Sequence, residues 1–433
     1  MAPPNTSPQG GIAFDIPIRR LLHVESREIL LKITRNFTMK KLPALTSLRF
    51  FAAFAVVLHH SAGFLAGSTI AKTLALRQGV SFFFVLSGFI LTYTYISAGK
   101  KVDWWRFYLH RFARIFPTHV AGTILFIFLA GMWIPAIFSG DEYRHALYLN
   151  LAMAQSAIPL EKYYFSYNLV SWSISTEAFF YLAFPLMFTG KGKAPWIGFA
   201  ASLLAFAVMC WLSLYMGAPQ DSHTELSVNG LMYVNPLARM VEFALGCVTC
   251  HLFKSRAPTK SRARSVSTAI ECVAVIAVFV GLYAGTHARP FVSYYFGATI
   301  ASVFGWAGAA PIFAFLIYVF ARQSGRVSEA LSARPFVFLG EISFALYVTH
   351  FAILTKLEQY PEHFQGNVET FWIYLAMCLM VAWATHMLIE NPFRTLIVEK
   401  RLPTGATVGP MLRTGVVASA AVILAMLLTL KPV

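Results

Sequence analysis

The feature that most constrains this chain is the recurrence of apolar runs about 20 residues long. An α-helix rises about 1.5 Å per residue, so such a run crosses the roughly 30 Å hydrocarbon core of a bilayer. In hydrocarbon a helix satisfies all of its own backbone hydrogen bonds. The sequence therefore predicts an all-α integral membrane protein, a polytopic bundle of about ten or eleven transmembrane helices. The runs are 45–64, 79–97, 117–138, 168–189, 196–216, 234–253, 269–285, 294–320, 338–356, 370–389 and 412–431.

Composition and loop charge agree with this class. Hydrophobic residues make up 57% of the chain and charged residues 12%, whereas soluble domains are about 25% charged. Most of the 35 Lys and Arg residues fall in alternate loops, beginning with residues 1–44. The positive-inside rule then places the N-terminus and these loops in the cytoplasm. The net charge of +16 is thus mainly a cytoplasmic face suited to anionic lipids and small molecules, and no nucleic-acid partner is expected.

The chain divides into three expected regions. Residues 1–40 begin with a Pro-, Gly- and Ser-rich stretch, which predicts a disordered or interfacial cytoplasmic extension. Residues 41–397 contain the first ten runs, and residues 398–433 form a linker and an extra helix. The run 294–320 is long enough for a tilted helix, a broken helix or two short ones. The five cysteines lie in or beside apolar runs, so neither a disulfide framework nor a metal site is expected.

The first run contains ionisable residues in an otherwise apolar stretch, LRFFAAFAVVLHH. Arg49 and His60 are separated by three helical turns plus about 20°, so they share one face about 16 Å apart. Charged groups inside membrane helices are costly and usually face a cavity, a partner or a pathway. One face would thus carry a fixed cation near the cytoplasm and a titratable base near the outside. The alternative is that Arg49 snorkels to the interface and His60 sits among the outer headgroups.

Other runs also carry polar residues. Glu177 is an intramembrane carboxylate with Ser173 one turn before it on the same face. Arg239 and Glu242 have the i, i+3 spacing of an ion pair, which is consistent with a purely structural role. His350 lies toward the outer half of the ninth run.

A basic segment, WWRFYLHRFARIFP, follows the second run. Arg111 and Arg114 lie about one turn apart, and they would clamp phosphates presented from the cytoplasm. The alternative is that they are solvated topology signals. At the end of the tenth run, Glu390 and Arg394 of ENPFR are interpreted as a helix terminus and anchor.

Six of these segments, in this order, resemble the acyltransferase-3 family of integral membrane O-acyltransferases, which modify bacterial surface glycans and other acceptors. The resemblance covers about residues 44–395. Family members usually have ten core spans, so the run 412–431 looks like an appended helix. The chain resembles the standalone form, without a fused hydrolase-like domain. The segments are Arg49 with ten residues before His60, GVSFFFVLSGFILT, RFARIFP, NLVSWSISTEAFFYLAFP, ISFALYVTH and ENPFR.

The resemblance implies an enzyme of the bacterial inner membrane. It would move an acyl group, acetyl by family frequency, from cytoplasmic acyl-CoA to a hydroxyl of a cell-surface glycan or lipid-linked sugar. Acyl-CoA is then a co-substrate, and no permanently bound cofactor is implied. Its phosphates would meet Arg111, Arg114 and Arg49. His60 would act as general base, and Glu177 would orient or tune a histidine.

Attack by a hydroxyl on a thioester carbonyl also needs a donor for the oxyanion. Ser87, Ser173 and Tyr347 are the candidates for it. A covalent acyl-enzyme, formed on His60 or on a serine, stays open as a second route. The acceptor is open among lipopolysaccharide sugars, exopolysaccharide, capsule, periplasmic glucan and macrolides.

The alternative function is a membrane transporter of a glycan precursor or small molecule. Polar residues within spans also mark substrate and proton pathways, and His60, Glu177 and His350 would then form a relay. Paired broken helices or inverted repeats would favour that class, and the sequence offers no convincing pair.

Overall fold

The computed structural model describes residues 41–63, 72–96, 102–131, 141–188, 193–256, 263–364 and 368–399. Over these ranges the chain is helical and contains no strand. The described residues from Leu42 onward belong to one compact unit. The predicted extension 1–40 and the predicted span 412–431 lie outside the described residues.

The long helices correspond to the first ten predicted runs, which confirms the predicted class. Nine helical stretches of the described chain are long and apolar enough to cross a membrane. To these we add α2, whose mean hydropathy is lowered by an arginine and two histidines. The long helices are α2 (Pro43–His60), α4 (Gly79–Leu91), α5 (Trp104–Leu129), α9 (Trp172–Met187), α10 (Ala194–Tyr215), α11 (Pro236–Ser255), α12 (Arg264–His287), α13 (Arg289–Ala307), α14 (Ala310–Ala321), α16 (Arg334–Leu357) and α18 (Val368–Thr385).

Shorter elements extend or connect these helices. The long helix α4 is preceded by the 3₁₀ turn η2 and continued by a π-helical turn, η3, and α18 runs into η7 and α19. The short elements are η1 (Ser61–Gly63), η2 (Leu76–Gln78), η3 (Thr92–Ile96), α7 (Asp141–Leu151), η4 (Gln155–Ala157), α8 (Glu161–Tyr164), η5 (Leu169–Ser171), η6 (Asn229–Val234), α15 (Arg326–Leu331), α17 (Pro361–Phe364), η7 (His386–Glu390) and α19 (Asn391–Glu399).

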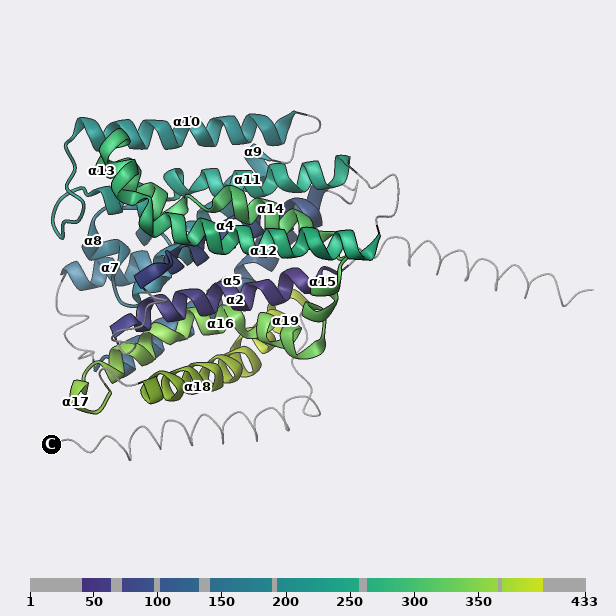
Figure 1. The fold of residues 1–433 in the computed structure, drawn as a ribbon. Coiled ribbons are helices and arrows are strands. Elements are labelled where there is room, and N and C mark those ends of the chain that lie inside the picture. Colours follow the sequence, from purple (N-terminus) through teal and green to yellow (C-terminus); the bar gives the residue numbers. More distant parts are fainter. Residues whose placement is uncertain are drawn as a thin grey trace, which may run out of the picture. The chain divides into compact units, whose positions relative to one another are not determined.

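Figure 1 shows the long helices side by side, with α10 at one edge of the bundle and α18 at the other. Neighbouring helices in the middle are α4 with α11 and α2 with α16. Small residues allow these pairs to approach closely. A Cβ added to Gly88 of α4 would clash with the backbone of Phe243, and one added to Gly340 of α16 would clash with the backbone of Thr46. Close contact through small residues is typical of helix pairs in membranes.

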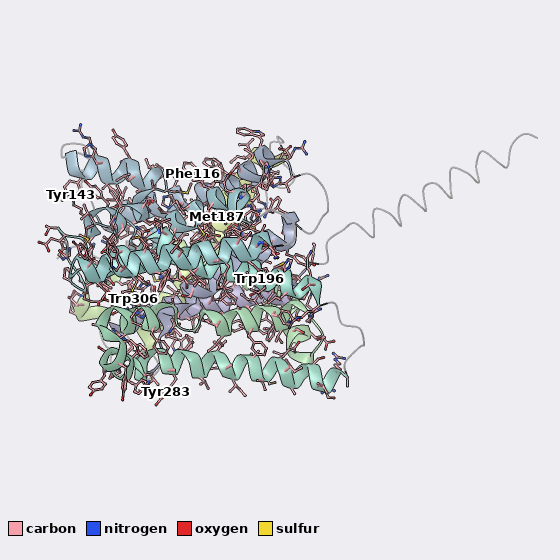
Figure 2. The ribbon with its side chains drawn as sticks, turned by 90° about the horizontal axis from the view of Figure 1, so that it is seen from above. Phe116, Tyr143, Met187, Trp196, Tyr283 and Trp306 are labelled. Atoms are coloured by element: carbon pink, nitrogen blue, oxygen red, sulfur yellow. The ribbon has the colours of Figure 1, made fainter. Side chains whose placement is uncertain are left out.

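The outer faces of the bundle are apolar. Helix α12 exposes Ile276, Phe279 and Tyr283, and α10 exposes Leu204 and Trp211. Figure 2 shows Tyr283 at the edge of the bundle, while Trp306 lies within it and is buried. Monomeric soluble proteins rarely expose apolar faces this long. Together with the membrane-spanning lengths of the helices, they indicate the lipid-facing surface of a multi-pass membrane protein.

The long run 294–320 is a broken helix, one of the forms that its length predicted. Gly297 has φ 84° and ψ 164°, which interrupts α13. A positive φ of this size strains any residue with a Cβ, and glycine adopts it freely. A second break separates α13 from α14, with Gly308 and Ala309 between them.

Candidate active site

Two cavities lie inside the bundle, with volumes of about 170 Å³ and 190 Å³. Val80 and Tyr347 line both of them, so the two cavities adjoin. A cavity of about 150 Å³ holds a benzene molecule, so each can take a group the size of a six-membered ring. The polar lining of the first cavity is Arg49, Ser87, Arg111, Arg114, Ser173, Glu177, Tyr181 and Tyr347. The polar and aromatic lining of the second is His59, His60, Arg77, Phe165, Trp172, Asn229, Tyr233 and Tyr347.

The structure brings most of the predicted site residues to these cavities. Arg49 and His60 share a face of α2, as their spacing predicted, but they line different cavities. Arg49 faces the first cavity and His60 the second. Among the predicted residues, those that line neither cavity are Arg239, Glu242 and His350.

His350 is nevertheless the partner of the predicted base. Its Nε2 lies 2.9 Å from His60 Nδ1, and the two rings are stacked with centroids 5.2 Å apart. The Nδ1 atom of His350 lies 2.7 Å from the carbonyl oxygen of Tyr347 and 3.2 Å from that of Leu346. His350 itself is fully buried on α16.

These contacts assign the protons of both rings. A carbonyl oxygen only accepts, so the proton of His350 is on Nδ1. A second proton, on Nε2, would make His350 a buried cation. None of the described carboxylates contacts it, and an unpaired buried charge is costly. His350 Nε2 therefore accepts, and His60 Nδ1 donates to it. In the neutral ring of His60 the other nitrogen, Nε2, then carries no proton, and this ring lines the second cavity.

Glu177 has other partners. Its Oε1 accepts a hydrogen bond from Ser87 Oγ at 3.0 Å and a short one from Tyr181 OH. These contacts lie at the first cavity, whereas His60 lines the second. Glu177 thus contacts no histidine among the described residues, and the side chain that bonds to His60 is His350. An orienting role for Glu177 stays a prediction.

Arginines dominate the first cavity. Arg111 lies over the rings of Tyr95 and Tyr181, at 5.7 and 5.8 Å from their centroids. Its Nε is buried and has no hydrogen-bond partner within the described chain. Arg49 likewise forms no ion pair within the described chain, and Glu177 is the one carboxylate that lines this cavity. The cavity is therefore electropositive.

Arg114 is held by a polar cluster that the sequence interpretation missed. It forms a short ion pair with Glu390, and its guanidinium lies 5.6 Å from the centroid of the Phe344 ring. Glu390 also bonds to His386 Nδ1 at 3.0 Å, and Asn391 Nδ2 lies 3.0 Å from His386 Nε2. Glu390 is fully buried, so its interpretation as an interfacial anchor is corrected. The π-helical turn η7 brings it inward, and such turns are frequent at functional sites.

The predicted Arg239–Glu242 ion pair forms, and it is wholly buried. Arg239 Nε lies 2.7 Å from Glu242 Oε2, in an ion-pair contact without hydrogen-bond geometry. Its Nη2 donates to Glu242 Oε1 at 3.2 Å and to Ser81 Oγ at 3.1 Å. The guanidinium also lies within 6.0 Å of the ring centroids of Trp172 and Tyr233. Arg239 thus packs against Trp172 and Tyr233, two rings that line the second cavity.

Tyr347 stands between the cavities. Its hydroxyl lies 2.7 Å from Ser173 Oγ and 3.3 Å from the carbonyl oxygen of Val170. The ring of Phe83 packs edge-on against it, with centroids 5.9 Å apart. Of the three oxyanion candidates, Tyr347 is the one that reaches both cavities, while Ser87 and Ser173 line the first.

A helical bundle with two adjoining polar cavities is a multi-pass membrane protein with an internal site for a small ligand. Residues 42–387 match the family model described as an acyltransferase domain. The chain belongs to this family and is a membrane O-acyltransferase.

Three relatives illustrate the match. Acyltransferase MdmB of Streptomyces mycarofaciens is 29% identical over 396 residues, which cover 83% of this chain and 94% of MdmB. O-acetyltransferase OatA of Staphylococcus aureus is 23% identical over 392 residues, or 84% of this chain and 59% of OatA. Peptidoglycan O-acetyltransferase OatA of Listeria monocytogenes is 23% identical over 390 residues, covering 84% of this chain and 57% of that protein. No solved structure matches the chain.

Proposed function

We propose that the enzyme transfers an acyl group, acetyl in the first instance, from cytoplasmic acyl-CoA to a hydroxyl of a cell-envelope glycan or lipid-linked sugar. The observation that carries this proposal is the His60–His350 hydrogen bond, which leaves an unprotonated nitrogen in a cavity that adjoins an arginine-lined one. The family match supports acyl transfer as the reaction. The relatives named as O-acetyltransferases support the acetyl group, and the one named for peptidoglycan supports a glycan acceptor.

The first cavity suits the acyl donor. Coenzyme A carries phosphates, and arginine binds phosphate oxygens through its planar fork of N–H groups. Arg111 has a buried N–H available for such a ligand, and Glu390 holds Arg114 in place. The positive-inside rule predicts that the segment with both arginines lies on the cytoplasmic side, which in this proposal is that of a bacterial inner membrane. Acyl-CoA would therefore enter the first cavity from the cytoplasm and extend its thioester toward Tyr347.

The second cavity suits the acceptor and the base. His60 Nε2 takes the proton of the acceptor hydroxyl while the hydroxyl oxygen bonds to the thioester carbonyl carbon. Tyr347 lines both cavities, and in this proposal its hydroxyl turns from the Val170 carbonyl to donate to the resulting oxyanion. The carbon–sulfur bond then breaks, the ester is released, and the CoA thiolate receives the proton from His60. While His60 holds that proton, its Nδ1–H bond to His350 stabilises the positive charge.

Acyl transfer by purified protein tests this proposal. The protein in nanodiscs would receive radiolabelled acetyl-CoA and an envelope glycan extract. We expect label in an alkali-labile glycan ester, and His60→Ala should lower the rate about 10²–10⁴-fold, the usual contribution of a positioned general base. His287→Ala, at an exposed histidine of α12, is the matched control and should keep full activity.

Two results would contradict the proposal. An unchanged rate of acyl transfer by His60→Ala would show that His60 is not the general base. A wild-type protein that releases no CoA from acetyl-CoA, with or without glycan, would instead fit the transporter alternative, because a transporter consumes no acyl-CoA.

A further inference from the structure

We infer that the second cavity is built for a sugar that carries an anionic group, a carboxylate or a phosphate, and that Arg77 binds that group. The inference rests on the proposed function for placing the acceptor in this cavity. It adds the charge of the acceptor, on which neither the family match nor the relatives bear.

The position of Arg77 is fixed by its neighbours. It lies in η2, directly before α4, and it lines the second cavity together with His60. The next residue, Gln78, is fully buried, and its Oε1 accepts from the backbone N–H of Ala309 at 2.7 Å. The backbone N–H of Ala75 donates to the carbonyl oxygen of Leu282 at 3.0 Å. The turn that carries Arg77 is therefore attached to α12 and to the start of α14.

The charge of Arg77 is not balanced within the cavity. Arg77 forms no ion pair with any described residue, and none of the residues that line the second cavity is acidic. An acidic side chain does lie close by, since Asn229 of the lining donates a short hydrogen bond to Asp221. Asp221 itself is not part of the lining. A cationic cavity without a carboxylate of its own favours an anionic occupant.

An anionic group on the acceptor would also lower the repulsion between Arg77 and protonated His60. Arg77 lines the same cavity as His59, His60 and Tyr233, and its positive charge acts on these three side chains. When His60 holds the acceptor proton, two positive charges share this cavity, and like charges repel. An anionic group on the acceptor would lie against Arg77 and offset that repulsion.

The remaining walls fit a sugar ring. Phe165, Trp172, Tyr233 and Tyr347 supply aromatic surface, and the ring centroids of Trp172 and Tyr233 are 4.7 Å apart. Small-molecule sites typically combine such surface with a few polar groups that fix the orientation of the ligand. An arginine fork binds carboxylate and phosphate oxygens in a bidentate manner. The second cavity thus combines an aromatic surface, an anion-binding group and a base.

Binding of two matched glycosides tests the inference without any acyl transfer. p-Nitrophenyl β-D-glucuronide and p-nitrophenyl β-D-glucoside differ in one carboxylate. Equilibrium dialysis against protein in nanodiscs, with empty nanodiscs subtracted, gives the Kd of each from the nitrophenyl absorbance. We expect the wild type to bind the glucuronide roughly tenfold or more tightly, the effect of one charge-assisted hydrogen-bonded contact.

Three variants separate the role of Arg77 from general damage. Arg77→Gln should bind both glycosides equally, and Arg77→Lys, which keeps the charge, should retain part of the preference. His60→Ala should keep the preference, because binding does not require the base. Arg326→Gln, at an exposed arginine of α15, should behave as the wild type.

Defined results would overturn the inference. Equal binding of the two glycosides by the wild type, or binding of neither, would do so, and so would a preference that survives in Arg77→Gln. Competition by glucuronate and by glucose 6-phosphate then shows whether a carboxylate or a phosphate is preferred. If the wild type prefers the glucuronide but transfers no acyl group from acetyl-CoA to any acceptor, the proposed function fails while the anion site stands.

Discussion

Arg239 and Arg111, the latter at the first cavity, are both arginines inside the bundle, but their charges are balanced in different ways. Arg239 has a carboxylate partner on its own helix and rings around it, and neither Arg239 nor Glu242 lines a cavity. Arg111 lies over the rings of Tyr95 and Tyr181, and its Nε has no hydrogen-bond partner in the described chain.

This difference separates two purposes of a buried charge. Burying a charged group costs desolvation free energy, and in a buried ion pair the attraction between the partners offsets that cost. Removing one partner leaves the other charge buried without compensation, which destabilises the protein. An arginine that lines a cavity without an ion pair gains its partner when a ligand arrives. The Arg239 pair should therefore act mainly on stability, and Arg111 mainly on binding.

The largest effect is expected from Arg239→Met. It leaves Glu242 buried without its cation, which typically costs about 3–5 kcal/mol. Thermal unfolding in nanodiscs, followed by tryptophan fluorescence, should show a clear fall in Tm. The double variant Arg239→Met/Glu242→Leu should recover most of the loss, because it removes both charges. If Arg239→Met is as stable as the wild type, the Arg239–Glu242 pair does not act on stability, and the difference drawn between Arg239 and Arg111 is wrong.

A smaller effect, on binding alone, is expected from Arg111→Met. Loss of a charge-assisted hydrogen bond to a phosphate corresponds to roughly a 10- to 150-fold weaker interaction. The KM for acetyl-CoA should rise by a factor in this range, with Tm close to the wild-type value. Arg106→Met is the matched control on the same helix, because the Arg106 side chain is 78% exposed and pairs with Asp103 at the surface. A fall in Tm with unchanged KM would make Arg111 a structural residue.

Much of the fold could be predicted because it depends on local pattern. Ten apolar runs of membrane-spanning length located the long helices of the described chain, and helical spacing put Arg49 and His60 on one face. The i, i+3 spacing likewise identified the Arg239–Glu242 pair. In each case the pattern involves residues of a single helix.

The contacts that define the site could not be predicted in this way. His60 and His350 are 290 residues apart. The sequence grouped them only in the relay of the transporter alternative, and no spacing rule predicts that the two rings are in contact. Sequence reasoning therefore assigned the orienting role to Glu177, whose actual partners are Ser87 and Tyr181. Arg77 was overlooked because it falls between two apolar runs, where a basic residue reads as part of a loop. Its role depends on the tertiary contacts that attach η2 to α12 and α14.

The smallest effect is expected at His350, which acts on the reaction through His60. His350→Phe removes the acceptor of the His60 Nδ1–H bond, and an unsatisfied donor costs about 1–3 kcal/mol. We expect kcat for acyl transfer to fall roughly tenfold, because His60 loses both its orientation and the bond that stabilises its protonated form. The KM for acetyl-CoA should stay unchanged, since His350 does not line the first cavity. His350→Gln, whose amide oxygen can accept the same hydrogen bond, should retain more activity than His350→Phe. Equal activity of the two variants would mean that the hydrogen bond does not position the base, and the second cavity would then resemble the Arg239 cluster, where buried contacts serve stability alone.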